Sequence, residues 1–380
     1  MRRDIGTYRQ VSLRSAIGVL LLMFVVCVIA SCSGDETLDS RDIRDRELTF
    51  RILSEKTVSK ATTTTIATLE NFRVSAYWRE SPGVGFTPNF MYNISVIKNS
   101  SDNWIYSPIK YYPPSGGVDF YAYSPYNSMS ATNFAESAAT PELKYVVPPA
   151  ASLQEDFLIA KAVATHDGST WTNPWGTIPN PVNMEFKHAL SQVVFDARST
   201  AKGVKFIIKE ITITNLKPSG AIDLSTQTWG APAGTDTHYP VDIASPVVFD
   251  FAPGTGTLPE FEAITDDAAG TAMMVLPQTV TPGTAGVKTS EPGKSHITIT
   301  YAAISWNNTP LYGAFDEDAD YGDAVPEVTE YVTDYISLAI GAFEMGKRYR
   351  FQLNLGTGLI PVSFDVGVTT WPNPAVIIRL

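Results

Sequence analysis

The chain between residues 71 and 371 contains many short stretches in which apolar and polar side chains alternate. In NFRVSAYW (71–78), one face of an extended chain carries Phe72, Val74, Ala76 and Trp78. The same period of two recurs in KRYRFQLNLG (347–356) and in LIPVSFDVGVTTW (359–371). Because successive side chains of a strand point to opposite faces, this alternation predicts half-buried β-strands.

Further apolar stretches of strand length are separated by turn signals such as Pro113–Gly117. We expect strands at ELTFRIL (47–53), MYNISVIK (91–98), NWIYSP (103–108), GVDFYAYSPY (117–126), KFIIKEITITNL (205–216), TAMMVLPQ (271–278) and SHITITYAAISW (295–306). The stretch QEDFLIAKAVAT (154–165) fits either a strand or a short helix. The pattern predicts an all-β fold with two tandem β-sandwiches, at 47–185 and 186–380.

The first 46 residues follow a different pattern. Four arginines precede an apolar run from Ala16 to Ala30, which is shorter than the roughly 20 residues of a membrane-spanning helix. Ile29-Ala30-Ser31 before Cys32 resembles a bacterial lipobox, so we expect residues 1–31 to be a signal peptide and Cys32 to carry lipid. The alternative is an ordinary signal peptide with an incidental cysteine. The charged residues 32–46 are then a tether.

Composition excludes several function classes. The formal net charge is -11, and an acidic chain repels phosphate backbones, so nucleic acid is not an expected partner. Both cysteines, Cys27 and Cys32, lie at the N-terminus. The mature chain therefore has no disulfide scaffold, no cysteine–zinc site and no thiol nucleophile.

The sequence offers little catalytic or cofactor chemistry. None of the four histidines (His166, His188, His238 and His296) has metal-ligand spacing to another, and we expect His188 to be a packed, hydrogen-bonded residue. Acidic residues are too plentiful to single out a hydrolase pair. We expect no cofactor, no catalytic residue and no enzymatic activity.

One acidic stretch, DEDADYGDAVPE (316–327), is a weak calcium candidate. Its ligand positions, spaced like those of an EF-hand loop, are Asp316, Asp318, Asp320 and Glu327. Tyr321 stands where that loop needs glycine, so a solvated acidic loop is the stronger interpretation and no metal site is predicted.

Two tryptophans in a loop, Trp171 and Trp175, are the best candidates for stacking on sugar rings. They support an alternative function, a non-polymerising surface lipoprotein that binds glycans. Buried packing is the stronger interpretation for both side chains.

The order of the motifs resembles the fimbrillin-like subunits of type V pili (the FimA/Mfa-like superfamily). The resemblance rests mainly on FYAYSPY (120–126), QEDFL (154–158) and FKHALSQVVF (186–195), and it extends over the whole mature chain. It implies two tandem transthyretin-like β-sandwiches and export as an outer membrane lipoprotein to the cell surface or fimbrium. It also implies assembly by strand exchange with other fimbrial subunits, and adhesion to a host glycan or protein receptor.

In that family the first strand is removed by proteolysis, and a C-terminal strand of the next subunit fills the groove. Here the removable strand is 47–53, which offers Leu48, Phe50 and Ile52 to the core. The donor strand is 375–380, in which Val376, Ile378 and Leu380 share one face.

The processing site departs from the family pattern, which has an arginine after the first strand. Residues 54–70 contain Lys56 and Lys60 but no arginine. The candidate processing positions are therefore Lys60 with Ala61, Arg51 inside the strand, and Arg46 before it. A chain that stays whole would be an anchoring or accessory subunit.

Overall fold

The computed structural model describes residues 47–53, 69–80, 87–128, 130–132, 141–167, 169–173, 176–177, 181–265, 271–284, 286–287, 289–357 and 362–371. Within these residues the fold is all-β, as the alternation predicted. One 3-10 turn, η1 (Ala151–Leu153), is present, and the described residues contain no α-helix. Consequently, nothing in the described part of the chain has the helical length and apolar character that a membrane crossing requires.

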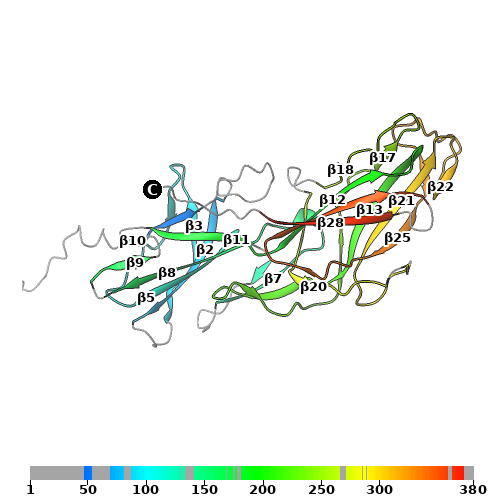
Figure 1. The fold of residues 1–380 in the computed structure, drawn as a ribbon. Coiled ribbons are helices and arrows are strands. Elements are labelled where there is room, and N and C mark those ends of the chain that lie inside the picture. The colour runs from blue at the N-terminus through cyan, green and yellow to red at the C-terminus, as the bar shows by residue number, and fades with distance from the viewer. Residues whose placement is uncertain are drawn as a thin grey trace, which may run out of the picture. The chain divides into compact units, whose positions relative to one another are not determined.

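The first sheet has nine strands and contains the N-terminal strand (Figure 1). Its strands are β1 (Phe50–Leu53), β2 (Asn71–Arg79), β3 (Thr87–Lys98), β4 (Trp104–Tyr106), β5 (Gly117–Ser124), β8 (Leu158–His166), β9 (Trp171–Asn173), β10 (Gly176–Thr177) and β11 (Val182–His188). They follow the order β1-β11-β8-β5-β2-β3-β4, with β9 and β10 beside β8. The ambiguous stretch 154–165 thus supplies a strand, β8.

Two further sheets hold most of the C-terminal part of the chain. One contains β12 (Ser191–Ser199), β18 (Glu262–Ala263), β19 (Met273–Val275), β27 (Lys347–Leu355) and β28 (Val362–Thr370). The other contains β13 (Val204–Leu216), β16 (Thr237–Pro240), β17 (Val247–Phe251), β21 (His296–Ser305), β22 (Pro310–Tyr312) and β25 (Val332–Ser337). In the first of these, β28 is the last strand of the path β18-β12-β27-β28.

Three small sheets complete the fold. They are β15 (Thr228–Trp229), β14 (Ser219–Asp223), β7 (Glu142–Val146) and β6 (Ala131–Thr132) in that order, β20 (Gln278–Thr279) with β26 (Ala342–Phe343), and β23 (Ala314–Phe315) with β24 (Val328–Glu330). The β7–β14 ladder joins segments on either side of residue 185. A domain boundary at that position, and the division into two tandem sandwiches, stay predictions.

Buried side chains form two apolar clusters. The first-sheet cluster includes Leu48, Phe50, Phe72 and Phe186, and all its buried members lie between residues 48 and 186. The second, larger cluster includes Phe195, Phe351 and Trp371. Strand β5 contributes Phe120 to the first cluster and Tyr121 to the second, because alternate residues of one strand point to opposite faces. The central strands of the first sheet are therefore buried on both faces.

Candidate functional site: the seat of the first strand

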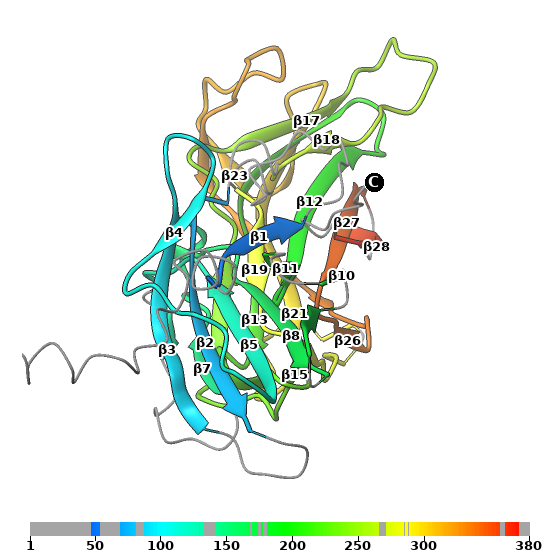
Figure 2. The same ribbon diagram turned by 90° about the vertical axis from the view of Figure 1, so that its left-hand side faces the viewer.

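The first strand and the residues before it bond to β11 on one side and to the segment that follows β4 on the other. From Phe50 to Leu53, β1 runs parallel to β11, paired with Val182 to Glu185 (Figure 2). Just before it, the Leu48 N–H donates to the Lys110 carbonyl at 2.9 Å, and the Tyr106 hydroxyl donates to the Leu48 carbonyl at 2.7 Å. We call this position the strand seat: the β11 edge on one side and residues 106–110 on the other.

The strand begins three residues later than predicted because the chain changes its hydrogen-bonding partner. Leu48 bonds to the Lys110 side of the seat, whereas the Thr49 carbonyl accepts from the Val182 N–H of β11 at 2.7 Å. Ladder pairing with β11 then starts at Phe50. The segment 47–49 is thus a crossing between two edges, and β1 proper is four residues long.

The inward side chains of this segment are buried. Leu48 is 0 %, Phe50 5 % and Ile52 8 % exposed. The Phe50 ring makes edge contacts with Phe72 at 5.7 Å, Tyr106 at 5.5 Å and Phe120 at 6.1 Å between ring centroids. These are the three positions that the alternation in 47–53 assigned to the core.

The candidate processing and lipidation residues are only partly described. Arg51 is exposed within β1, opposite Asn183 of β11. Cys32, Arg46, Lys60 and Ala61 lie outside the described residues.

Among the described residues, β28 pairs with a single neighbouring strand. It pairs with β27 along its whole length, from Val362 opposite Leu355 to Thr370 opposite Lys347. Apart from buried Val362 and half-buried Phe364, its side chains are exposed, including Val366 at 36 % and Val368 at 51 %. The predicted donor residues Val376, Ile378 and Leu380 lie outside the described residues.

The side chains of the QED motif (Gln154, Glu155 and Asp156) make hydrogen bonds to neighbouring segments of the chain. The Met274 N–H donates to the Gln154 side-chain oxygen at 2.6 Å. Glu155 accepts hydrogen bonds from the Ser128 and Tyr145 hydroxyls. Burial raises the pKa of the Glu155 carboxyl above its ordinary value, against the lowering effect of these two bonds. All three motif side chains are therefore structural.

His188 is packed and hydrogen-bonded, as predicted. Its ring is fully buried, Nδ1 lies 2.8 Å from Asp156 Oδ1, and the ring stacks on Trp371 at 3.9 Å. The Asp156 carboxylate thus fixes the orientation of the imidazole.

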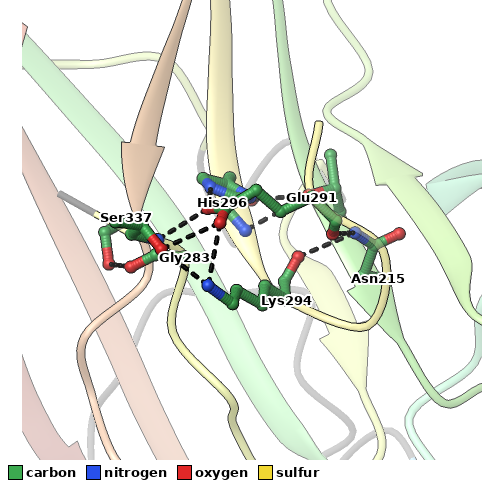
Figure 3. Close-up of polar contacts among 8 residues, drawn as sticks. Asn215, Gly283, Glu291, Lys294, His296 and Ser337 are labelled. Carbon is green, nitrogen blue, oxygen red and sulfur yellow. Dashed lines mark hydrogen bonds and ion pairs between the residues drawn. The ribbon is translucent and has the colours of Figure 1, made fainter. Parts of the chain in front are cut away.

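A second buried histidine belongs to a polar cluster that the sequence did not reveal (Figure 3). His296 Nε2 lies 3.2 Å from Glu291, whose carboxylate also accepts from Lys294 Nζ at 2.8 Å and from the Thr284 N–H at 2.6 Å. These hydrogen bonds lower the pKa of Glu291 to about 2, and the bond from Lys294 makes the largest contribution. A Cβ on Gly283 would lie 1.9 Å from His296 Nε2, so this close approach requires glycine. The cluster fastens the loop between β20 and β21.

The acidic loop does not form a calcium site. Lys205 Nζ donates to the carbonyls of Tyr321 and Asp323 at 2.6 Å each. Asp320 accepts from the Gly322 N–H and from Asn308, and these bonds lower its pKa. In the described residues no group of three or more His, Cys, Asp or Glu side chains could hold a metal ion. The structure does not bring Asp316, Asp318, Asp320 and Glu327 together as ligands.

Of the two tryptophans considered for stacking on sugar rings, Trp171 is buried. Trp171 is 6 % exposed, its Nε1–H donates to the Pro113 carbonyl at 2.7 Å, and its ring packs on Tyr112. It braces a loop, because a buried indole needs an acceptor for its N–H. Trp175 lies outside the described residues.

Comparisons with known proteins agree with this fold. A family model described as fimbrillin-like matches residues 59–371. A fimbrium subunit of Phocaeicola vulgatus, Fim1C, is 31 % identical over 118 residues, which cover 29 % of this chain and 31 % of that protein. The match therefore spans about a third of the length of this curated relative.

Solved structures show the same architecture. The crystal structure of a fimbrial protein from Bacteroides vulgatus aligns with a TM-score of 0.62 at 16 % identity, over 86 % of this chain and 99 % of that one. A weaker likeness, with a TM-score of 0.39 at 9 % identity, is to the tip fimbrial protein Mfa3 of Porphyromonas gingivalis, over 86 % of this chain and all of that one. With the family model matching most of its length, the chain belongs to the fimbrillin-like family.

Proposed function

We propose that this chain is a structural subunit of a cell-surface fimbria and assembles by β-strand donation. The observation that carries the proposal is the strand seat, in which one short segment bonds to Val182 of β11 and to Lys110 at the opposite edge. When this segment departs, the β11 edge loses its ladder partner, and an unpaired edge recruits strands.

Departure of residues 47–53 would also open an apolar slot. Leu48, Phe50 and Ile52 would leave the positions they fill beside Phe72 and Phe120. Burying one such side chain stabilises a fold by about 1.5–3 kcal/mol, so an empty slot is costly. A strand with apolar residues at alternate positions would restore both the hydrogen bonds and the burial.

The donor in this proposal is the C-terminal segment 375–380 of a neighbouring subunit. Its Val376, Ile378 and Leu380 have the same spacing as Leu48, Phe50 and Ile52. Side chains at this spacing occupy one face of a strand, which is what the slot needs.

Processing after Lys60 would remove β1 completely and leave Ala61 as the first residue. A cut after Arg51 would keep Ile52 with the body of the chain, and a cut after Arg46 would keep the whole strand. Before this step, lipid on Cys32 would hold the chain at the outer membrane. The assembled fibre would support adhesion to a host glycan or protein receptor.

Disulfide trapping tests the donation step. Glu185 is exposed on β11, so Glu185→Cys is combined with a single cysteine placed in turn at each of residues 375–380. We expect intermolecular disulfides in fibres, strongest at alternate tail positions. The matched control places the first cysteine at Glu330, which is exposed on β24. Equal trapping at Glu185 and Glu330, or none at Glu185 in fibres, would contradict strand donation.

A further inference from the structure

A short buried connection links the strand seat to the C-terminal part of the chain. Ala189 and Leu190 alone separate β11 from β12. The Ala189 N–H donates to the Phe157 carbonyl at 2.8 Å, and the Leu190 carbonyl accepts from the Gly346 N–H at 3.0 Å. Both residues are buried. A shift of β11 would therefore disturb their hydrogen bonds to Phe157 and Gly346.

The last residue of β11 contacts the residue that directly follows β28. The rings of His188 and Trp371 are stacked 3.9 Å apart at an interplanar angle of 10°. Both side chains are fully buried, and the Trp371 N–H donates to the Gly346 carbonyl at 2.9 Å. The end of the strand that holds β1 is therefore in contact with the end of the C-terminal edge strand.

Ring contacts lead from β1 to β11, the strand that ends at His188. Phe50 contacts Phe72 at 5.7 Å, and Phe72 contacts Phe186 of β11 at 5.4 Å. Phe186 lies two residues before His188 on the same strand. Close-packed side chains of this kind transmit displacement, because packed interiors have few voids to absorb it.

The indole N–H of Trp371 is buried and lacks a hydrogen bond among the described residues. A buried donor without an acceptor costs free energy. The ring is thus held by stacking, without the hydrogen bond that secures Trp171 to Pro113.

We propose that the His188–Trp371 stack couples the strand seat to the C-terminal segment. While β1 is in place, β11 holds Trp371 and keeps the end of β28 docked. When β1 leaves, the stack loosens, and the end of β28 loses its contact with β11. This inference rests on the proposed function, because it links opening of the slot to the C-terminal edge strand.

Hydrogen exchange measured by mass spectrometry on the full chain tests the coupling in both directions. Trp371→Ala is expected to speed exchange of the β1 and β11 amides by about 5- to 150-fold, the range of typical site–site coupling. Phe50→Ala is expected to speed exchange of the Trp371 amide by a similar factor, because coupling between two sites is reciprocal.

Three control variants separate coupling from general loss of stability. Trp371→Phe keeps a stacking ring and removes the unpaired N–H, so β1 should exchange as in the unmodified chain. Trp306→Ala removes a tryptophan that is 63 % exposed, and it should change hydrogen exchange neither in β1 nor at Trp371. Ile299→Ala removes a buried side chain of β21 and gives the pattern of uniform destabilisation.

The coupling is refuted if Trp371→Ala speeds exchange only in β28, or if its pattern matches that of Ile299→Ala. The formation of disulfide-trapped oligomers, measured as in the test of strand donation, is recorded separately for the same variants. Coupled exchange without any oligomer would refute the proposed function and leave the coupling. Oligomers without coupled exchange would refute the coupling alone.

Discussion

Strands β1 and β28 both lie at the edge of a sheet, and they are held there by different forces. β1 is four residues long, yet Phe50 and Ile52 are buried in the first-sheet cluster. β28 pairs over nine residues, but Val366 and Val368 are exposed. Side-chain burial thus holds the short strand, whereas backbone hydrogen bonds hold the long one.

The largest effect is expected from Phe50→Ala. Removing a large buried aromatic side chain typically lowers the free energy of unfolding by about 3–5 kcal/mol. Urea denaturation of the full chain measures this loss. A change below 1 kcal/mol, about the level of a surface substitution, would mean that burial does not hold β1.

A smaller effect is expected from Tyr106→Phe, which removes the hydroxyl that donates to the Leu48 carbonyl. The same hydroxyl accepts from the Lys110 N–H at 3.1 Å. The loss of these two hydrogen bonds should cost about 1–3 kcal/mol, measured by the same denaturation. Tyr111→Phe is a suitable control because Tyr111 is exposed. Equal losses in the two variants would argue against the contact at the Lys110 side of the seat.

Acid should weaken the C-terminal part of the chain before the strand seat. The pKa of Glu291 is lowered to about 2, so its stabilising effect is present above pH 4.5 and is lost as pH falls toward 2. Burial raises the pKa of Asp119 in β5, so falling pH relieves a cost there. Hydrogen exchange between pH 7 and pH 3 should therefore rise first in residues 284–296.

Glu291→Gln provides the control for the acid experiment. This variant should be less stable at pH 7, and its stability should change less on acidification. Earlier loss of protection in β5 than in residues 284–296 would contradict the assignment.

The smallest effect is expected from Val368→Ser. Substitution of an exposed side chain changes the free energy of unfolding by within about 0.5 kcal/mol. Denaturation should therefore barely separate this variant from the unmodified chain. A loss as large as that of Phe50→Ala would show that β28 is also held by burial, and the contrast between the two edges would disappear.

Alternation predicted the all-β fold, many of the longer strands and the buried face of the first one. It could not predict that β1 pairs in parallel with β11, because a period of two assigns side chains to faces and names no partner strand. Burial was the favoured interpretation for Trp171 and is confirmed, but its hydrogen-bond acceptor, the Pro113 carbonyl, is far away in the sequence and could not be predicted. The Glu291–His296 cluster was missed for the same reason: loop geometry brings its members together.

Motif order carried information that single residues did not. Gln154, Glu155 and Asp156 form part of the motif QEDFL, and in the structure each makes a separate structural hydrogen bond. In the acidic loop, the spacing of Asp316 and Asp318 resembles that of calcium ligands, whereas the carbonyls of Tyr321 and Asp323 accept from Lys205. Spacing indicates chemistry only when the backbone also takes the required shape.

The most direct test of the central claim is the intact mass of the mature chain on its native cell surface. If a neighbour's strand replaces β1, the fimbrial form should begin after Leu53, with Ala61 as the expected first residue. A form in which every molecule begins at a lipidated Cys32 and retains residues 47–53 would contradict strand replacement.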